Sequence, residues 1–286
     1  MTPPEISAQE FQHFKDKYQV SHVTGDLTPT VCEMFGVRTP AQCGGTAIAE
    51  VVDQAYRLMG GEGKAQKILV FCPDAVGDIQ AQRYPEWFRH VQDVAGFKVP
   101  SVTMMPSVTP VCFGTIFSGA SPQVHGIQKY EKPVLTVETI FDVLAEAGKN
   151  VAILAINQCS IDTIFRKRNV DYFSFRTDEQ VFQMTQRLLN DSDYDFIVSY
   201  MMDYDHVSHQ KGPWAPESLE QLQLAVERFE KLAKAVDAHW GRYNRALIFA
   251  PDHGNHQIDA ETGGHGADIP DDMLVNHFYR IRGAKL

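Results

Sequence analysis

The sequence has few cysteines, no long apolar run and no excess of basic residues. Its five cysteines are scattered and never form a Cys-x-x-Cys pair, which excludes a disulfide framework and a thiolate zinc site. No apolar run approaches the length that spans a membrane. The formal net charge of −10 argues against a general nucleic-acid-binding protein, which needs a basic face. We therefore expect neither a membrane nor a nucleic-acid polymer among its partners.

Two further patterns are missing. The first residues, "MTPPEISAQEFQHFKDKYQ", lack the basic-then-apolar order of a signal peptide, so we expect a cytoplasmic protein. The segment "GGEGKA" (60–65) is not a phosphate-binding P-loop, because its leading Gly is missing and Ala follows the Lys. The 286 residues otherwise have the composition of a globular protein, 44% hydrophobic and 22% charged, and are enough to bury a substantial core.

Short apolar, β-branched runs alternate with helical patterns along most of the chain. Buried strands are predicted at 67–72, 150–156, 194–200 and 245–250, with a weaker strand at 99–105. Helices are predicted at 46–59, 137–148, 177–190 and 216–240. The alternation predicts a single α/β domain with a mainly parallel central sheet and helices on both faces. Residues 1–66 are expected to form a helical N-terminal extension, packed on a core of residues 67–286.

Three of the predicted strands are followed closely by an aspartate, and two of these aspartates have a histidine nearby. Taken singly, each has a structural explanation, since an Asp after a strand often caps a turn and an Asp–His pair at i, i+4 is often solvated. In an open parallel sheet, however, ligands lie beyond the carboxyl ends of the strands. Carboxylate and imidazole groups without thiolate suit zinc, with manganese or another divalent ion as the alternative. The residues concerned are Asp74, Asp205, His209, Asp252, His253 and His265.

A candidate nucleophile, Thr109, opens a helix-compatible run in "MPSVTPVCFGTIFSGASPQVHGI" (105–127). A Thr at the start of a helix is ordinarily only a cap. The same geometry aims backbone N–H groups at an anion and favours phosphate binding. With a metal alongside, the hydroxyl can ionise and attack a phosphorus atom. The residues alone leave both interpretations open.

Four segments of the chain, in order, resemble motifs of the alkaline phosphatase superfamily. The resemblance is strongest to its type I phosphodiesterase/nucleotide pyrophosphatase and phosphonoacetate hydrolase branches, and it runs from about residue 67 to the C-terminus. "PSVTPVCFGTIFSGASPQVHGI" resembles the nucleophile segment, and "DHVSHQKGP" resembles the Asp-x-x-x-His-x-x-Gly-Pro motif. "PDHG" and "GGHGAD" resemble the Asp-His-Gly motif and the final His-Gly.

The resemblance implies an alkaline-phosphatase-like, two-metal phosphoester hydrolase that acts through a phospho-threonine intermediate on Thr109. Two cations would clamp the attacking and leaving oxygens of an in-line displacement. The substrate would be a small-molecule phosphate ester or phosphonate. Alternatives are a phosphonate hydrolase or phosphomutase using the same site and, from another class, a catalytically silent metal-binding protein. The implied ligands are Asp205, His209 and His265 for one ion, and Asp74, Asp252, His253 and the Thr109 oxygen for the other.

The chain also departs from the family pattern. Cys112 is followed by "FGTI" rather than by the Pro-x-Arg context of sulfatases, so a sulfatase is not expected. The phosphate-binding Asn that relatives carry after His-Gly-Ile is absent from "HGIQKYEKP". Lys129 and Tyr130 are candidate substrate-binding residues in its place, with an exposed loop pair as the alternative. His206 and His256 are expected to bind no metal directly.

A second departure concerns the order of segments. "GDLTPTVCEMFGVRTP" (25–40) resembles an element that relatives place after the last metal-binding histidine, whereas here the chain ends soon after His265. We expect this element to be supplied from the N-terminus, as in a circular permutation, or by another subunit, and the sequence leaves a homo-oligomer open. Short loops such as 156–180 and 210–216 are expected to select the substrate.

Overall fold

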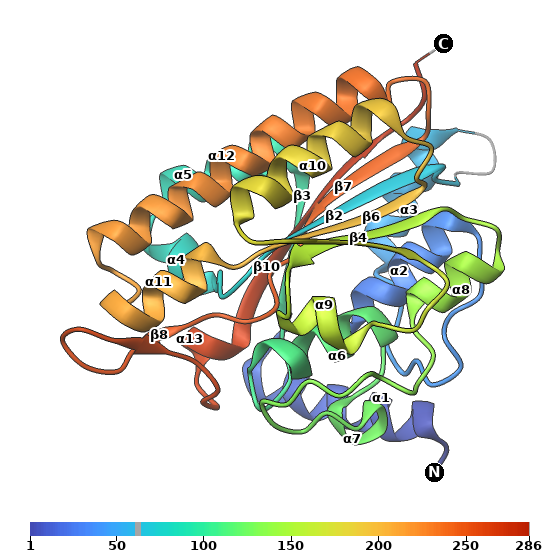
Figure 1. Cartoon of the computed structure of the whole chain (residues 1–286). Helices are drawn as coiled ribbons and strands as arrows, with labels where there is room; N and C mark the ends of the chain where they lie inside the picture. Colours follow the sequence, from blue (N-terminus) through green and yellow to red (C-terminus); the bar gives the residue numbers. More distant parts are fainter. Residues whose placement is uncertain (61–63, 286) are drawn as a thin grey trace.

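The computed structural model describes residues 1–60 and 64–285, so the segment 60–65 lies partly outside the described residues. In this part of the chain the main sheet has eight strands in the order β1-β3-β10-β7-β2-β6-β4-β5, and β8 and β9 form a small separate ladder (Figure 1). The strands are β1 His22–Val23, β2 Lys67–Pro73, β3 Gly96–Val102, β4 Val151–Ile156, β5 Asp171–Phe175, β6 Phe196–Met201, β7 Arg245–Phe249, β8 His256–Gln257, β9 Gly263–Gly264 and β10 Leu274–Arg282.

The main sheet is parallel apart from β10, which runs antiparallel to both β3 and β7. Its central strands are buried on both faces, because every residue of β2, β6 and β7 is buried. Burial on both faces explains why these strands read as continuous apolar runs rather than as alternating ones. The predicted mainly parallel sheet is confirmed.

Helices cover both faces of the sheet, as the alternation predicts (Figure 1). Helices α5, α10 and α12 pack on one face, where Phe88, Val181 and Phe229 belong to a single apolar cluster. Helices α2, α3, α6, α8 and α9 pack on the other. The helices are α1 Pro3–Tyr18, α2 Leu27–Phe35, α3 Ala49–Met59, α4 Asp78–Arg83, α5 Pro85–Ala95, α6 Thr109–Ser118, α7 Pro122–His125, α8 Ile140–Glu146, α9 Ser160–Ile164, α10 Asp178–Asp191, α11 Asp203–Lys211, α12 Pro216–His239 and α13 Pro270–Met273.

The N-terminal segment shares the core of the rest of the chain. Leu27 and Ile48 lie in the same buried apolar cluster as Ile68. Helix α3 packs against β10 near the C-terminus, and a Cβ on Gly283 would come within 2.2 Å of the Leu58 carbonyl oxygen. Residues 25–60 therefore lie where the permutation hypothesis requires them, although the hypothesis itself stays a prediction.

The edge strands β1 and β5 were not predicted from the sequence. Strand β10 was not predicted, although it lies between β3 and β7 in the middle of the sheet order. The weak strand expected at 99–105 is β3, which ends at Val102. Among the described residues, no helix has both the length and the apolar character needed to cross a bilayer.

Candidate active site

The candidate nucleophile Thr109 lies at the N-terminus of α6, facing the carboxyl ends of β2 and β7. Its side chain is only 4% exposed. The hydroxyl Oγ1 lies 3.5 Å from Asp74 Oδ2 and 3.4 Å from His253 Nε2. Helix N-termini carry a partial positive charge, so this position favours an anion such as a phosphoryl group.

The first candidate metal group consists of Asp74, Asp252 and His253, which follow β2 and β7. All three are buried, with at most 1% of each residue exposed. His253 Nε2 lies 3.5 Å from Asp74 Oδ1 and 3.3 Å from Asp252 Oδ2. The Nδ1 of the same ring lies 2.9 Å from the Gly254 carbonyl oxygen. In the tautomer that donates from Nδ1 to that carbonyl, Nε2 is the nitrogen available to a metal ion.

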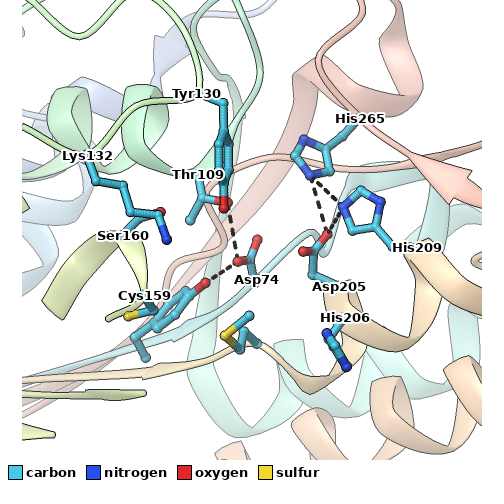
Figure 2. A pocket seen from close by; sticks show the side chains of 12 residues that line it. Asp74, Thr109, Tyr130, Lys132, Cys159, Ser160, Asp205, His206, His209 and His265 are labelled. Atoms are coloured by element: carbon cyan, nitrogen blue, oxygen red, sulfur yellow. Dashed lines mark hydrogen bonds and ion pairs between the residues drawn. The ribbon is translucent and has the colours of Figure 1, made fainter. Parts of the chain in front are cut away.

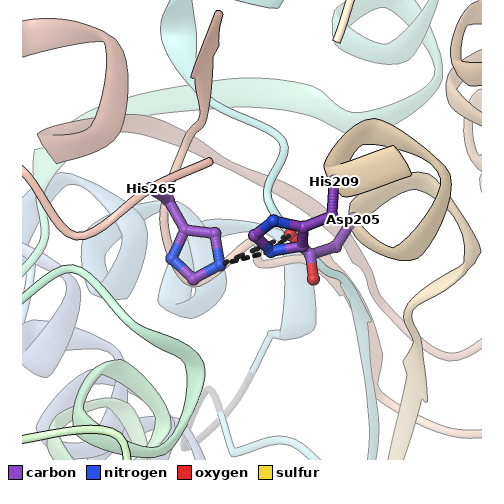
Figure 3. Close-up of side chains that lie close together, drawn as sticks. All are labelled: Asp205, His209 and His265. Carbon is purple, nitrogen blue, oxygen red and sulfur yellow. Dashed lines mark hydrogen bonds and ion pairs between the residues drawn. The ribbon is translucent and has the colours of Figure 1, made fainter. Parts of the chain in front are cut away.

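The second candidate metal group consists of Asp205, His209 and His265 (Figure 3). Asp205 and His209 lie one turn apart on α11, and His265 follows β9. His209 Nε2 lies 3.4 Å from Asp205 Oδ1, and His265 Nε2 lies 3.5 Å from the same oxygen. As in the first group, each ring turns Nδ1 to a backbone carbonyl, that of Gly263 at 3.2 Å and that of Ser107 at 2.8 Å.

The carboxylates of the two groups carry buried oxygens without a hydrogen-bond partner among the described residues, namely Asp74 Oδ1, Asp205 Oδ1 and Asp252 Oδ2. Burial raises the pKa of Asp252 to about 8. Burial, followed by the neighbouring Asp252 carboxylate, raises the pKa of Asp74 well above its usual value. Burial and then Asp74 do the same to the pKa of Asp205. Converging buried acceptors of this kind are costly without a positive partner.

Two histidines of the second group, His209 and His265, have a lowered pKa, which favours the neutral form. Burial, followed by the neighbouring His253, lowers the pKa of His265 to about 2. Burial also lowers the pKa of His209. Neutral imidazole nitrogens beside carboxylate oxygens form the donor set that suits zinc and related divalent ions. The carboxylate and imidazole atoms of both groups are therefore suitable ligands for a metal ion.

The two groups and Thr109 border one cavity of about 360 Å³ (Figure 2). Asp74, Thr109, Asp205, His209 and His265 line it, whereas Asp252 and His253 are fully buried and do not line it. The structure thus brings together all seven residues that the sequence singled out as ligands or nucleophile.

Of the two candidate substrate-binding residues, only Tyr130 lies at the cavity. Tyr130 lines the cavity, and burial followed by the Asp74 and Asp205 carboxylates raises its pKa, so its phenol stays protonated and can donate. Lys129 does not line the cavity; its side chain is 75% exposed and its Nζ lies 3.4 Å from Glu131 Oε2. Of the spare histidines, His206 lines the cavity and His256 bonds Asp272 at 2.7 Å.

Sequence reasoning missed several residues of the cavity wall. The Tyr200 hydroxyl donates to Asp74 Oδ2, and Tyr200 comes from the buried end of β6. Lys132, Cys159 and Ser160 form the wall opposite Asp205 (Figure 2). The position of Tyr200, five residues before Asp205 at a strand end, is a signal that could have pointed to it. The loop that carries Lys132 has no periodicity from which its orientation could be read.

A family model described as type I phosphodiesterase/nucleotide pyrophosphatase matches residues 94–283, about two thirds of the chain. The human GPI ethanolamine phosphate transferase 2 catalytic subunit is 24% identical over 193 residues. That alignment covers 63% of this chain but 18% of the human protein, so the chain spans about a fifth of the length of this curated relative.

Several solved structures share the fold of this chain. Phosphonoacetate hydrolase from Sinorhizobium meliloti, in complex with phosphonoformate, has a TM-score of 0.50 at 18% identity, covering 67% of this chain and 57% of its own. Human ectonucleotide pyrophosphatase/phosphodiesterase 5 has a TM-score of 0.57 at 11% identity, covering 76% and 88%. An inactive Thr-to-Ala form of the murine protein with AMP has a TM-score of 0.54 at 15% identity, covering 68% and 58%. The expected alkaline-phosphatase-like fold is confirmed.

Proposed function

The chain belongs to the type I phosphodiesterase/nucleotide pyrophosphatase family, and from this we propose that it is a metal-dependent hydrolase of phosphate esters with Thr109 as its nucleophile. The observation that carries the proposal is the position of the Thr109 hydroxyl, within 3.5 Å of Asp74 and His253 at a buried helix N-terminus. A murine structural neighbour that is inactive as a Thr-to-Ala form supports a catalytic role for a threonine.

We propose that the seven residues hold two divalent ions, zinc in the first instance and manganese as the alternative. Asp205, His209 and His265 would form one site, and Asp74, Asp252, His253 and the Thr109 oxygen the other. When bound, such ions supply the positive charge that ionises a hydroxyl near neutral pH and neutralises phosphoryl oxygens.

The chain's own groups account for positioning and proton movement. Thr109 Oγ1 forms a bond to phosphorus while the bond from phosphorus to the leaving oxygen breaks, and the hydroxyl proton departs toward Asp74 Oδ2, which lies 3.5 Å from Oγ1. A water molecule then attacks the phospho-threonine, which releases phosphate or a phosphate monoester and restores the hydroxyl. The Tyr200 hydroxyl holds Asp74 in place throughout.

A phosphonate hydrolase, or a phosphomutase, is a second candidate for the same site. Tyr130 lines the cavity where relatives are expected to carry an amide, so the wall that meets the substrate differs from that of a nucleotide pyrophosphatase. A solved neighbour of this fold is a phosphonoacetate hydrolase bound to phosphonoformate. The change in the wall, rather than the ligand groups, is what separates the two candidates.

The test is metal analysis followed by hydrolysis of nitrophenyl phosphate and bis-nitrophenyl phosphate, with Thr109→Ala as the control. The proposal expects stoichiometric metal in both proteins and turnover only in the unaltered one. Preference between the two esters separates a monoesterase from a diesterase. Metal-loaded protein with equal background rates in both would support the catalytically silent alternative.

A further inference from the structure

The cavity has two walls of opposite character (Figure 2). One wall carries the carboxylates and imidazoles described above. The other carries Lys132, together with the hydroxyls of Ser160 and Tyr130. An ammonium group cannot ligate a cation, so Lys132 has no place in the metal groups and must serve another part of the site.

The Lys132 side chain is held in position and still has donors to spare. Its Nζ donates to the Gln158 carbonyl oxygen at 3.0 Å, and it lies 5.6 Å from the centre of the Tyr130 ring. Within the described residues, no carboxylate lies within ion-pair distance of it. Since an ammonium has three N–H donors, two remain for a ligand.

The backbone around Gln158 fixes this arrangement. Gln158 has φ +63, a left-handed conformation that is unfavourable for a non-glycine residue. Its N–H donates to Asp162 Oδ2 at 2.9 Å, which leaves its carbonyl oxygen turned to Lys132. A strained residue that presents an acceptor to a lysine at a cavity wall is consistent with a positioned, rather than a solvated, cation.

The remaining groups of this wall do not neutralise Lys132. Ser160 is 3% exposed and lines the cavity. Burial raises the pKa of Cys159 to about 12, so its thiol is uncharged at neutral pH. The raised pKa of Tyr130 keeps its phenol neutral as well. Lys132 therefore provides the positive charge of a wall whose other groups are neutral donors.

We propose that Lys132 and Ser160 form a second anion-binding subsite, which selects substrates with a negatively charged group on the part that does not become attached to Thr109. This inference rests on the proposed function, which places the phosphoryl group at the opposite wall. Carboxylates and phosphates both match a lysine and a hydroxyl. The cavity of about 360 Å³ is at the small end of ligand sites, so the preferred substrates are compact.

The test compares phosphonoacetate with phosphonoacetamide, which has the same shape but lacks the carboxylate charge. Binding is measured by calorimetry on metal-loaded protein in a Thr109→Ala background, so that neither probe is consumed. The proposal expects phosphonoacetate to bind roughly 10-fold or more tightly than the amide, as is typical of a charge-assisted hydrogen bond. Lys132→Gln should abolish this preference by weakening the binding of phosphonoacetate more than that of the amide, and Lys132→Arg should retain part of it.

Lys129→Gln is the matched control, because Lys129 belongs to the same loop but lies outside the cavity; it should leave the preference intact. A preference that survives Lys132→Gln, or equal affinities in the parent protein, would overturn the subsite while the phosphoryl site stands. Failure of both probes to bind the parent protein would overturn the proposed function and the subsite with it.

Discussion

The Nε2 atoms of His209 and His265 lie 3.1 Å apart, and both rings turn Nδ1 to a backbone carbonyl. If both Nδ1 atoms carry the proton, the two Nε2 lone pairs face one another beside Asp205 Oδ1. Lone pairs this close repel unless a cation or proton lies between them. Protonation is opposed by the lowered pKa of both rings, so the arrangement favours a bound cation.

Removal of metal should therefore destabilise the protein. Treatment with a chelator is expected to lower the thermal midpoint, because the three buried carboxyl groups then lose the cations that stabilise their ionised forms. Readdition of zinc should restore it, in line with stabilisation by a ligand that binds only the folded state. Differential scanning calorimetry with and without chelator measures the effect. An unchanged midpoint in protein shown to have lost its metal would contradict this expectation.

Asp205→Asn should separate metal binding from folding. The substitution removes a carboxyl group whose ionised form is disfavoured by burial, so the metal-free variant should be as stable as the metal-free parent or more stable, by about 1–3 kcal/mol. The same variant should lose one metal equivalent, because an amide is a weaker ligand than a carboxylate. Urea unfolding of both metal-free proteins, with elemental analysis of the metal-loaded ones, tests the two halves. A variant that keeps its full metal content would count against Asp205 as a ligand.

Tyr200→Phe should weaken the site without unfolding the protein. The phenol donates to Asp74 Oδ2 from a fully buried position, and loss of such an outer partner typically lowers metal affinity or activity by about 10- to 100-fold. Competition with a chromogenic chelator measures the affinity. Tyr279→Phe is the control, since Tyr279 is also buried but lies outside the cavity; it should leave metal affinity unchanged.

His125 should make stability depend on pH. Its Nδ1 accepts from the Ile127 N–H at 3.2 Å, and its Nε2 lies 3.1 Å from Thr115 Oγ1. Burial lowers the pKa of His125 to about 4, below the value of about 6.5 in an unfolded chain. The unfolded state therefore binds more protons between about pH 6.5 and 4, and the free energy of unfolding falls as the pH falls through that window.

The His125 contribution should amount to about 3 kcal/mol across that window. Urea unfolding at several pH values should show a shallower dependence in His125→Gln than in the unaltered protein. Metal-free protein is used for both series, so that loss of ligands to protons does not add to the slope. An identical pH dependence of the free energy of unfolding in the two proteins would show that His125 does not contribute to it.

The candidate ligands could be predicted because the sheet is parallel. Asp74 and Asp252 follow buried strands that lie side by side, and the carboxyl ends of such strands meet at one edge. The start of α6 at Thr109 could likewise be predicted, because Pro110 has a backbone conformation that suits the first turn of a helix. Such features can be predicted from local sequence because each depends on one strand or one helix end.

Other features depend on distant parts of the chain. Strand β10 pairs with β3 and β7. It was not recognised from the sequence because it contains the polar residues Asn276 and His277, which are buried nonetheless; His277, for example, contacts the Pro251 carbonyl oxygen. Lys132 rather than Lys129 reaches the cavity because the carbonyl of Gln158, from beyond β4, meets it. Neither contact can be predicted from the local sequence, because each joins segments that are distant along the chain.

Two adjoining cation sites beside Thr109 are central to the proposed chemistry, and crystals grown with zinc test for them most directly. Anomalous scattering at the zinc edge should show two ions, one among Asp205, His209 and His265, and the other among Asp74, Asp252 and His253 with the Thr109 oxygen. Ions absent from both groups in protein saturated with zinc, or bound only elsewhere, would contradict the account.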